Sequence, residues 1–283
     1  MKTMKTFDII LTNDPDHGLT HDYVPIFKSL SSMGLKVTTG VFCTIEPWDE
    51  HPNASKSLAK HCRKDETHAL DDPAYKDLML EIQSLGHEIA YHGYSQISNT
   101  REKFEEGLEI FKDVFGKYPF TYIEHGGNPK KHDIAMCKKE TLAMDGANSN
   151  SKYFVQDIIV DKINCTWAYH DLLDGDYNLK TPKELFYNEN GMLLFKRHRM
   201  NHFINILNNE STDFSENKLF IGYTHFGYQG YKGHSKMYKD DSAVLECWIN
   251  WPFLDNAINT LKNVMDKHNP TSYTIEEYVK TKL

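Results

Sequence analysis

Short apolar runs of the kind that form buried strands alternate along the chain with segments in which apolar residues recur at helical spacing. Six of these runs end in residues with metal-binding or acid–base chemistry: FDIILTN at Asp14 and Asp16, HEIAYH at His92, FTYIEH at His125, CTWAYH at His170, MLLFKRH at His198 and LFIGYTH at His225. Alternation of strands and helices is typical of a parallel sheet or barrel. The carboxyl ends of the strands in such a barrel meet on one face, so the pattern predicts a metal or acid–base site there.

The segments between the runs carry helix signals. Asp72 and Pro73 predict the start of one helix, in which Leu78, Ile82 and Leu85 recur until Gly86. Asn99 and Glu102 form a cap signature before a second helix, whose core face is expected to carry Phe104, Leu108, Phe111 and Phe115. Further helices are expected near 22–33, 131–142, 201–208 and 252–267, a strand over 35–45, and capping boxes at Thr181 and Thr274. The polar stretches 46–72 and 226–242 are expected to be loops at the site, within one domain spanning 1–283.

Composition and charge narrow the function classes. The chain has 283 residues, of which 40% are apolar and 25% charged, as in globular proteins. The net charge is −8 and no basic cluster is longer than two residues, so nucleic acid is a poor candidate partner. No run reaches membrane-spanning length, and the first residues do not resemble a signal peptide. Five cysteines without a CxxC pair favour reduced thiols and a cytoplasmic location.

Asp14, Pro15 and Asp16 are the first candidate for chemistry. Pro15 cannot extend a strand ladder and fixes its own φ, so the two carboxylates are expected on a rigid turn. One carboxylate can bind a divalent cation while its neighbour acts as base on a water molecule. A plain Asp-Pro-Asp turn without function is the alternative. His61, Cys62 and His68 lack zinc-finger spacing and are expected at the surface.

The segment GHEIAYHGYSQ, residues 86–96, resembles the second motif of the polysaccharide deacetylases of carbohydrate esterase family 4, G-H-E-I-x-x-H-[ST]-x-x-H. The resemblance implies that His92 binds a divalent metal, with Gln96 at the position of the family's second histidine. The run LTNDPD resembles the first motif, T-F-D-D, which implies that Asp14 is the catalytic base and Asp16 a metal ligand. FIGYTH resembles the last motif, L-x-H, which implies that His225 is the general acid.

Two positions depart from the family pattern. The third motif, R-P-P-x-G, is absent, and IEHGGN at 123–128 takes its place, so the family's arginine would have to be replaced by Arg197 or Arg199. His125 is placed to supply the ligand that Gln96 cannot, because an imidazole binds zinc better than a carboxamide oxygen does. Both His125 and Gln96 stay open as the third ligand. His170 and His198 are equally compatible with supporting hydrogen bonds and with polar positions on the rim.

The resemblance implies an α/β fold, a distorted (β/α)7-type barrel. It also implies a metal-dependent hydrolase, with zinc as the first candidate metal, that removes an acetyl or formyl group from the nitrogen of an amino sugar. A small or lipid-linked sugar in surface polysaccharide biosynthesis is the expected substrate. The alternatives are an amidohydrolase that acts on a cyclic ureide or imide, a catalytically inactive relative that binds sugars, and a metal-free hydrolase. No feature of the sequence points to a particular oligomeric state.

Overall fold

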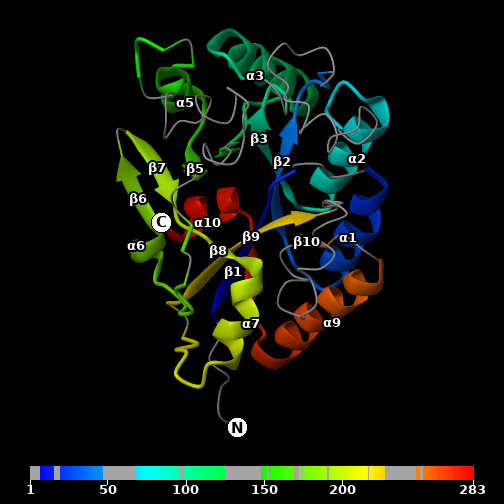
Figure 1. Ribbon diagram of the computed structural model, residues 1–283, viewed down its shortest axis with the longest axis vertical. Coiled ribbons are helices and arrows are strands. Elements are labelled where there is room, and N and C mark those ends of the chain that lie inside the picture. Colours follow the sequence, from blue (N-terminus) through cyan, green and yellow to red (C-terminus); the bar gives the residue numbers. More distant parts are fainter. Residues whose placement is uncertain are drawn as a thin grey trace, which may run out of the picture.

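The fold is a curled, mostly parallel sheet with helices around it (Figure 1). The computed structural model describes residues 7–15, 20–46, 68–95, 99–124, 148–151, 153–167, 172–173, 175–189, 191–215, 217–226, 247–248 and 251–283. The strands are β1 (Asp8–Asn13), β2 (Val37–Phe42), β3 (Glu88–Gly93), β4 (Thr121–Ile123), β5 (Cys165–Trp167), β6 (Phe186–Glu189), β7 (Met192–Phe195), β8 (His198–Arg199), β9 (Leu219–Phe226), β10 (Cys247–Trp248) and β11 (Thr271–Tyr273).

Parallel pairings run from β1 to β7 in one direction and from β1 through β9 to β8 in the other, and the chain itself joins β7 to β8. β1 to β5 pair in chain order, and β5 pairs with β7. Two residues separate β7 from β8, which pairs with β9, and β9 pairs with β1. The ring is irregular, because β11 pairs with the first half of β1 and β2 with the second half. The prediction of a distorted (β/α)7-type barrel is confirmed.

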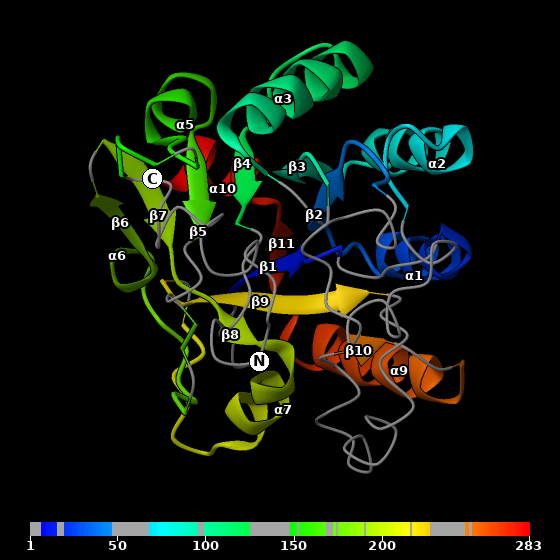
Figure 2. The same ribbon diagram turned by 45° about the horizontal axis from the view of Figure 1, so that its top comes forward.

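Most helices lie around the outside of the strands, whereas α10 packs against the inner residues of the strands (Figure 2). Their bounds are α1 (Thr20–Ser32), α2 (Pro73–Ser84), α3 (Arg101–Phe115), α5 (Gln156–Lys162), α6 (Pro182–Leu185), α7 (Met200–Asn208), α9 (Trp251–His268) and α10 (Ile275–Lys282). Asp72 caps α2 by accepting a hydrogen bond from Ala74 N, as predicted. The capping boxes at Thr181 and Thr274 are also confirmed.

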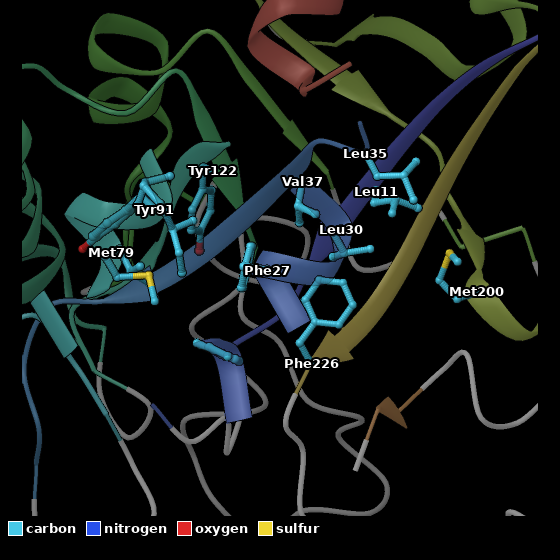
Figure 3. Packing of buried hydrophobic residues seen from close by; sticks show 14 of the residues in the cluster. Leu11, Phe27, Leu30, Leu35, Val37, Met79, Tyr91, Tyr122, Met200 and Phe226 are labelled. Atoms are coloured by element: carbon cyan, nitrogen blue, oxygen red, sulfur yellow. The ribbon is translucent and has the colours of Figure 1, made fainter. Parts of the chain in front are cut away.

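Two apolar clusters stabilise this arrangement. The outer cluster packs strand residues such as Leu11 and Val37 against helix residues such as Phe27 and Leu30 (Figure 3). The inner cluster contains Ile10, Ala90, Ile123, Trp167 and Ile221 from the strands, together with Ile275 and Tyr278 from α10. Alternate residues of one strand therefore enter different clusters, which is the expected result of the two-residue period of a strand. The inner face is the one that carries the candidate site.

Several local expectations need correction. The helix expected to continue until Gly86 ends at Ser84, with Leu85 as its C-cap. Thr100, not Asn99, precedes the first residue of α3, since the Asn99 side chain bonds Tyr94 N and Ser95 O instead. The strand expected over 35–45 is confined to 37–42.

Other expectations lie partly or wholly outside the described residues. The helix near 131–142 does so entirely, as do His61 and Cys62, whereas His68 is half-buried. Cys43 and Cys165 are buried free thiols. In the part of the chain that the structure describes, no helix is both long enough and apolar enough to cross a membrane.

Candidate functional site

The two-residue period of the strands brings three predicted side chains to the same end of the inner face. Asp14 follows Ile10 and Thr12 on the inner side of β1, His92 follows Glu88 and Ala90 on β3, and His225 follows Ile221 and Tyr223 on β9. Each therefore stands at the carboxyl end of its strand and points the same way as the inner apolar residues before it. This is the end at which strand–helix barrels carry their chemistry.

Asp14 lies between the two histidines. Its Oδ1 is 3.1 Å from His92 Nε2, and its Oδ2 is 3.5 Å from His225 Nε2. His92 is fully buried, while the side chains of Asp14 and His225 are 11% and 18% exposed, so the mouth of the site is at Asp14 and His225. These distances bring together three of the residues that the sequence placed at strand ends.

The His92 ring is fixed in one orientation. Its Nδ1 is 2.6 Å from Ile123 O, and Phe42 packs edge-on against the ring with centroids 4.7 Å apart. A carbonyl oxygen only accepts hydrogen bonds, so Nδ1 carries a hydrogen. In the neutral ring Nε2 is then an acceptor that faces the Asp14 carboxylate. Two acceptors at 3.1 Å require a proton or a cation beside them, and a ring whose Nδ1 donates to a backbone carbonyl is the usual arrangement of a metal-binding histidine.

The end of β1 is held by Asn13, a fully buried residue next to Asp14. Its amide nitrogen donates to Thr39 Oγ1 at 2.8 Å, and its oxygen accepts from Phe226 N at 2.7 Å. Asp14 N in turn donates to Thr224 O at 2.9 Å. These bonds align the ends of β1, β2 and β9, and so fix Asp14 relative to His225.

Gly40 leaves the space that the His92 ring needs. A Cβ atom at this position of β2 would lie 2.9 Å from Pro15 Cδ and 3.1 Å from His92 Cβ, both closer than normal contact. The absence of a side chain therefore lets β1 and β3 place Pro15 and His92 on either side of β2.

Tyr223, Arg197 and Trp167 form the wall of the site next to His225. The Tyr223 hydroxyl is 3.1 Å from His225 Nε2. The Arg197 guanidinium lies 3.7 Å from the centre of the Trp167 ring and 5.3 Å from that of Tyr223. The sequence raised Arg197 only as a substitute for the missing third-motif arginine and did not single out Tyr223. The signal for Tyr223 was its position two residues before His225, which gives both side chains the same direction.

Ile123 and Glu124, the described residues of the segment that replaces the third motif, contribute backbone carbonyl groups to the site. Ile123 O accepts from His92 Nδ1, and Glu124 O accepts from Trp167 Nε1 at 3.1 Å. Arg199, the other candidate substitute, pairs through its backbone with Tyr223 on β9.

The position of His198 corrects the expectation that the strand-end histidines all converge on the site. It is fully buried and stacks on Phe220 of the outer cluster, with ring centroids 5.4 Å apart. Arg197 precedes it and occupies the inner face, so the alternation turns His198 outward. Burial lowers the pKa of His198 to about 4, which keeps the ring neutral.

The remaining predicted ligands, Asp16, His125 and Gln96, lie outside the described residues, as does His170. Among the residues that the structure describes, no group of three or more histidine, cysteine or carboxylate side chains could hold a metal ion. The described part of the site therefore contains His92 as a candidate ligand, with Asp14 beside it.

Comparisons with known proteins concern the fold. No protein family model and no curated protein matches the sequence. Among solved structures, PuuE allantoinase is similar with a TM-score of 0.50 and 9% identity, over 98% of this chain and 91% of that one. A mutant of a peptidoglycan deacetylase from Bacillus subtilis has a TM-score of 0.41 at 10% identity, over 98% of this chain and 91% of that one. A polysaccharide deacetylase from Bacillus cereus has a TM-score of 0.39 at 13% identity, over 96% of this chain and 93% of that one.

Proposed function

We propose that the protein is a metal-dependent hydrolase that removes an acetyl or formyl group from the nitrogen of an amino sugar. The observation that carries the proposal is the position of the Asp14 carboxylate, 3.1 Å from the Nε2 of a locked, buried histidine and 3.5 Å from the Nε2 of a second, partly exposed one. An acid–base pair beside a cation site is what the hydrolysis of an unactivated amide requires.

The chain's own residues divide the work as follows. Asp14 takes a proton from the attacking water, because a carboxylate at the mouth of the site can accept it. His225 Nε2 gives a proton to the departing amine nitrogen as the C–N bond breaks. Asn13 and the Asp14 N to Thr224 O bond keep the base and the acid at a fixed separation. A protonated Asp14 could not accept the proton from water, and a deprotonated His225 could not donate one to the amine.

The donor set suits a divalent ion of the zinc type. His92, Asp16 and His125 would hold it, two imidazoles and a carboxylate being a common ligand set for catalytic zinc. A bound ion would polarise the acyl oxygen and lower the pKa of water. The lock on His92 Nδ1 fits this role, because it leaves Nε2 as the coordinating atom.

The third metal ligand can be identified by comparing the metal content of two variants. We expect His125→Ala to lower the metal content and Gln96→Ala to leave it unchanged, because imidazole is the stronger zinc ligand. Loss of metal in the Gln96 variant alone would assign the position to the amide instead.

The test of the function is release of acetate or formate from N-acyl amino sugars offered free, nucleotide-linked and lipid-linked. Asp14→Asn and His225→Ala should each lower turnover by about 10²- to 10⁴-fold while the metal stays bound. His268→Ala is the control, because His268 packs on Phe214 and on Phe7, which precedes β1 at the opposite end of the strand from Asp14. A metal-loaded protein that binds these sugars without cleaving them would favour the sugar-binding alternative.

Hydrolysis of a cyclic ureide is the second candidate. It is favoured by the fold similarity to PuuE allantoinase and by Trp167, whose ring is buried under Arg197 and so is closed to a sugar. The two candidates share the acid–base pair and differ in substrate. Cyclic ureides and imides belong in the same panel, and activity on these compounds alone would replace the deacylase proposal.

A further inference from the structure

We propose that Tyr223 is a further catalytic residue. Its hydroxyl hydrogen-bonds to His225 Nε2 both before and after this nitrogen gives up its proton. This inference rests on the proposed function, because it concerns the proton that His225 delivers. Nothing in the sequence motifs assigns a role to this side chain.

Two oxygen atoms face His225 Nε2. The Tyr223 hydroxyl is 3.1 Å away and the Asp14 Oδ2 is 3.5 Å away. Tyr223 and His225 are two residues apart on β9, so both enter the inner face, and their rings meet edge-on with centroids 5.0 Å apart. The hydroxyl is therefore in direct contact with the atom that carries the transferred proton.

The two oxygen atoms differ in what they can do. An ionised carboxylate only accepts hydrogen bonds, whereas a phenol hydroxyl both accepts and donates. While Nε2 carries its hydrogen, Asp14 and Tyr223 can both accept from it. After the proton has passed to the amine nitrogen and the C–N bond has broken, the bare Nε2 needs a donor. Tyr223 can rotate its O–H to supply one, and it keeps its own proton throughout.

The surroundings hold the tyrosine ring in place for this role. Trp167 packs against it at 79° with centroids 5.2 Å apart, and the Arg197 guanidinium, which covers the Trp167 ring, lies 5.3 Å from the tyrosine ring centre. Tyr223 is also aligned through its backbone with Thr12 on β1 and Arg199 on β8. The hydroxyl is the part of the side chain left to interact with His225.

The test is the Tyr223→Phe variant, which removes the hydroxyl and keeps the ring. We expect kcat to fall about tenfold, since one neutral hydrogen bond of ~1 kcal/mol or slightly more is lost after proton transfer. The alkaline limb of the pH–rate profile should move to higher pH, because the neutral form of His225 loses the donor that Tyr223 supplied while the Asp14 carboxylate still favours the protonated form. Tyr91→Phe is the matched control. Tyr91 lies on the outer face of β3, and the hydroxyl that this change removes donates to Phe104 O in α3.

A second readout does not require substrate. The pH at which the His225 imidazole loses its proton, followed by NMR with His225→Ala to assign the signal, should rise in Tyr223→Phe and stay constant in Tyr91→Phe. Wild-type kcat and an unchanged alkaline limb in Tyr223→Phe would overturn the proposal, as would a change in KM alone. If the wild-type protein releases no acyl group, the proposed function fails by itself, and an unchanged NMR transition would then overturn the role of Tyr223 separately.

Discussion

At the scale of single residues, the contact between His92 and Asp14 sets the chemistry of the site. Because Ile123 O fixes the hydrogen on Nδ1, the other ring nitrogen and the carboxylate stand 3.1 Å apart as two electron-rich atoms in a buried place. Burying such a pair is unfavourable unless positive charge compensates it. A metal ion bound at Nε2, as proposed above, would supply that charge, and a proton is the alternative.

Gly40 provides a residue-scale prediction. In Gly40→Ala the added Cβ would meet Pro15 Cδ and His92 Cβ, so one of the two neighbouring segments must move. We expect the free energy of unfolding to fall by about 1–3 kcal/mol, as for other overpacked positions, and metal affinity to fall with it. Thermal unfolding and metal titration measure the two effects.

Gly191→Ala is the control for this prediction. Gly191 has a φ of +84°, and a methyl group added there would approach no atom closer than 4.0 Å, so alanine strains the backbone without touching the site. It should lower stability and leave metal affinity intact. Equal loss of metal affinity in both variants would contradict the role assigned to Gly40.

At the scale of elements, Asn13 joins the ends of three strands. Replacing it in Asn13→Ala leaves Phe226 N and Thr39 Oγ1 without these buried bonds. We expect the free energy of unfolding to fall by roughly 2–4 kcal/mol, and kcat to fall because Asp14 and His225 lose their fixed separation. Asn148→Ala, which removes an exposed turn bond, should change neither. Denaturant unfolding together with the deacylation assay would detect both effects, and wild-type kcat in Asn13→Ala would count against the alignment.

The sequence predicted which strands carry the site but not which strand-end side chains face it. His92 and His225 follow inner residues at even spacing, whereas His198 comes one residue after an inner arginine and faces outward. The run MLLFK is apolar at four consecutive positions, so its sequence does not reveal which residues face inward. Tyr223 was not recognised because it also stands in a largely apolar run, FIGYT, although its side chain has the orientation of His225. Asn99 shows a second limit, since its side chain satisfies a loop instead of capping α3.

At the scale of the whole molecule, the far end of the barrel carries a second buried carboxyl group, that of Glu88. Its Oε2 accepts from Thr38 Oγ1 at 2.8 Å and from Glu276 N, in the first turn of α10, at 2.9 Å. The carboxyl group thus fastens the C-terminal helix to the strands. Burial is the main cause that raises the pKa of Glu88 to about 7.

This shift makes stability depend on pH in a definite direction. A carboxyl whose pKa is higher in the folded than in the unfolded state favours folding when it is protonated. That contribution is complete below the unfolded value near 4.5 and is lost as the pH rises through about 7. Glu88→Gln stays neutral at every pH, and its amide oxygen can still accept from Thr38 and Glu276.

We therefore expect Glu88→Gln to be more stable than the wild-type protein at pH 8 and about equally stable at pH 5. Glu109→Gln is the control, because this exposed carboxylate has a lowered pKa, mainly from its bond with Tyr118, and its loss should not stabilise the protein at pH 8. Thermal unfolding at the two pH values provides the measurement. A Glu88 variant that is less stable than the wild-type protein at pH 8 would mean that the ionised carboxylate strengthens the attachment of α10.

The most direct test of the account is the metal content of the purified protein, measured by elemental analysis after incubation with zinc, cobalt or nickel. The account predicts about one divalent ion per chain, lost in His92→Ala and kept in His198→Ala, which removes an equally buried strand-end histidine from the outer face. Thermal unfolding of both variants separates loss of metal from loss of fold. A wild-type protein that remains empty with all three metals, or a folded His92→Ala variant that keeps its ion, would contradict the metal centre proposed at His92, Asp16 and His125.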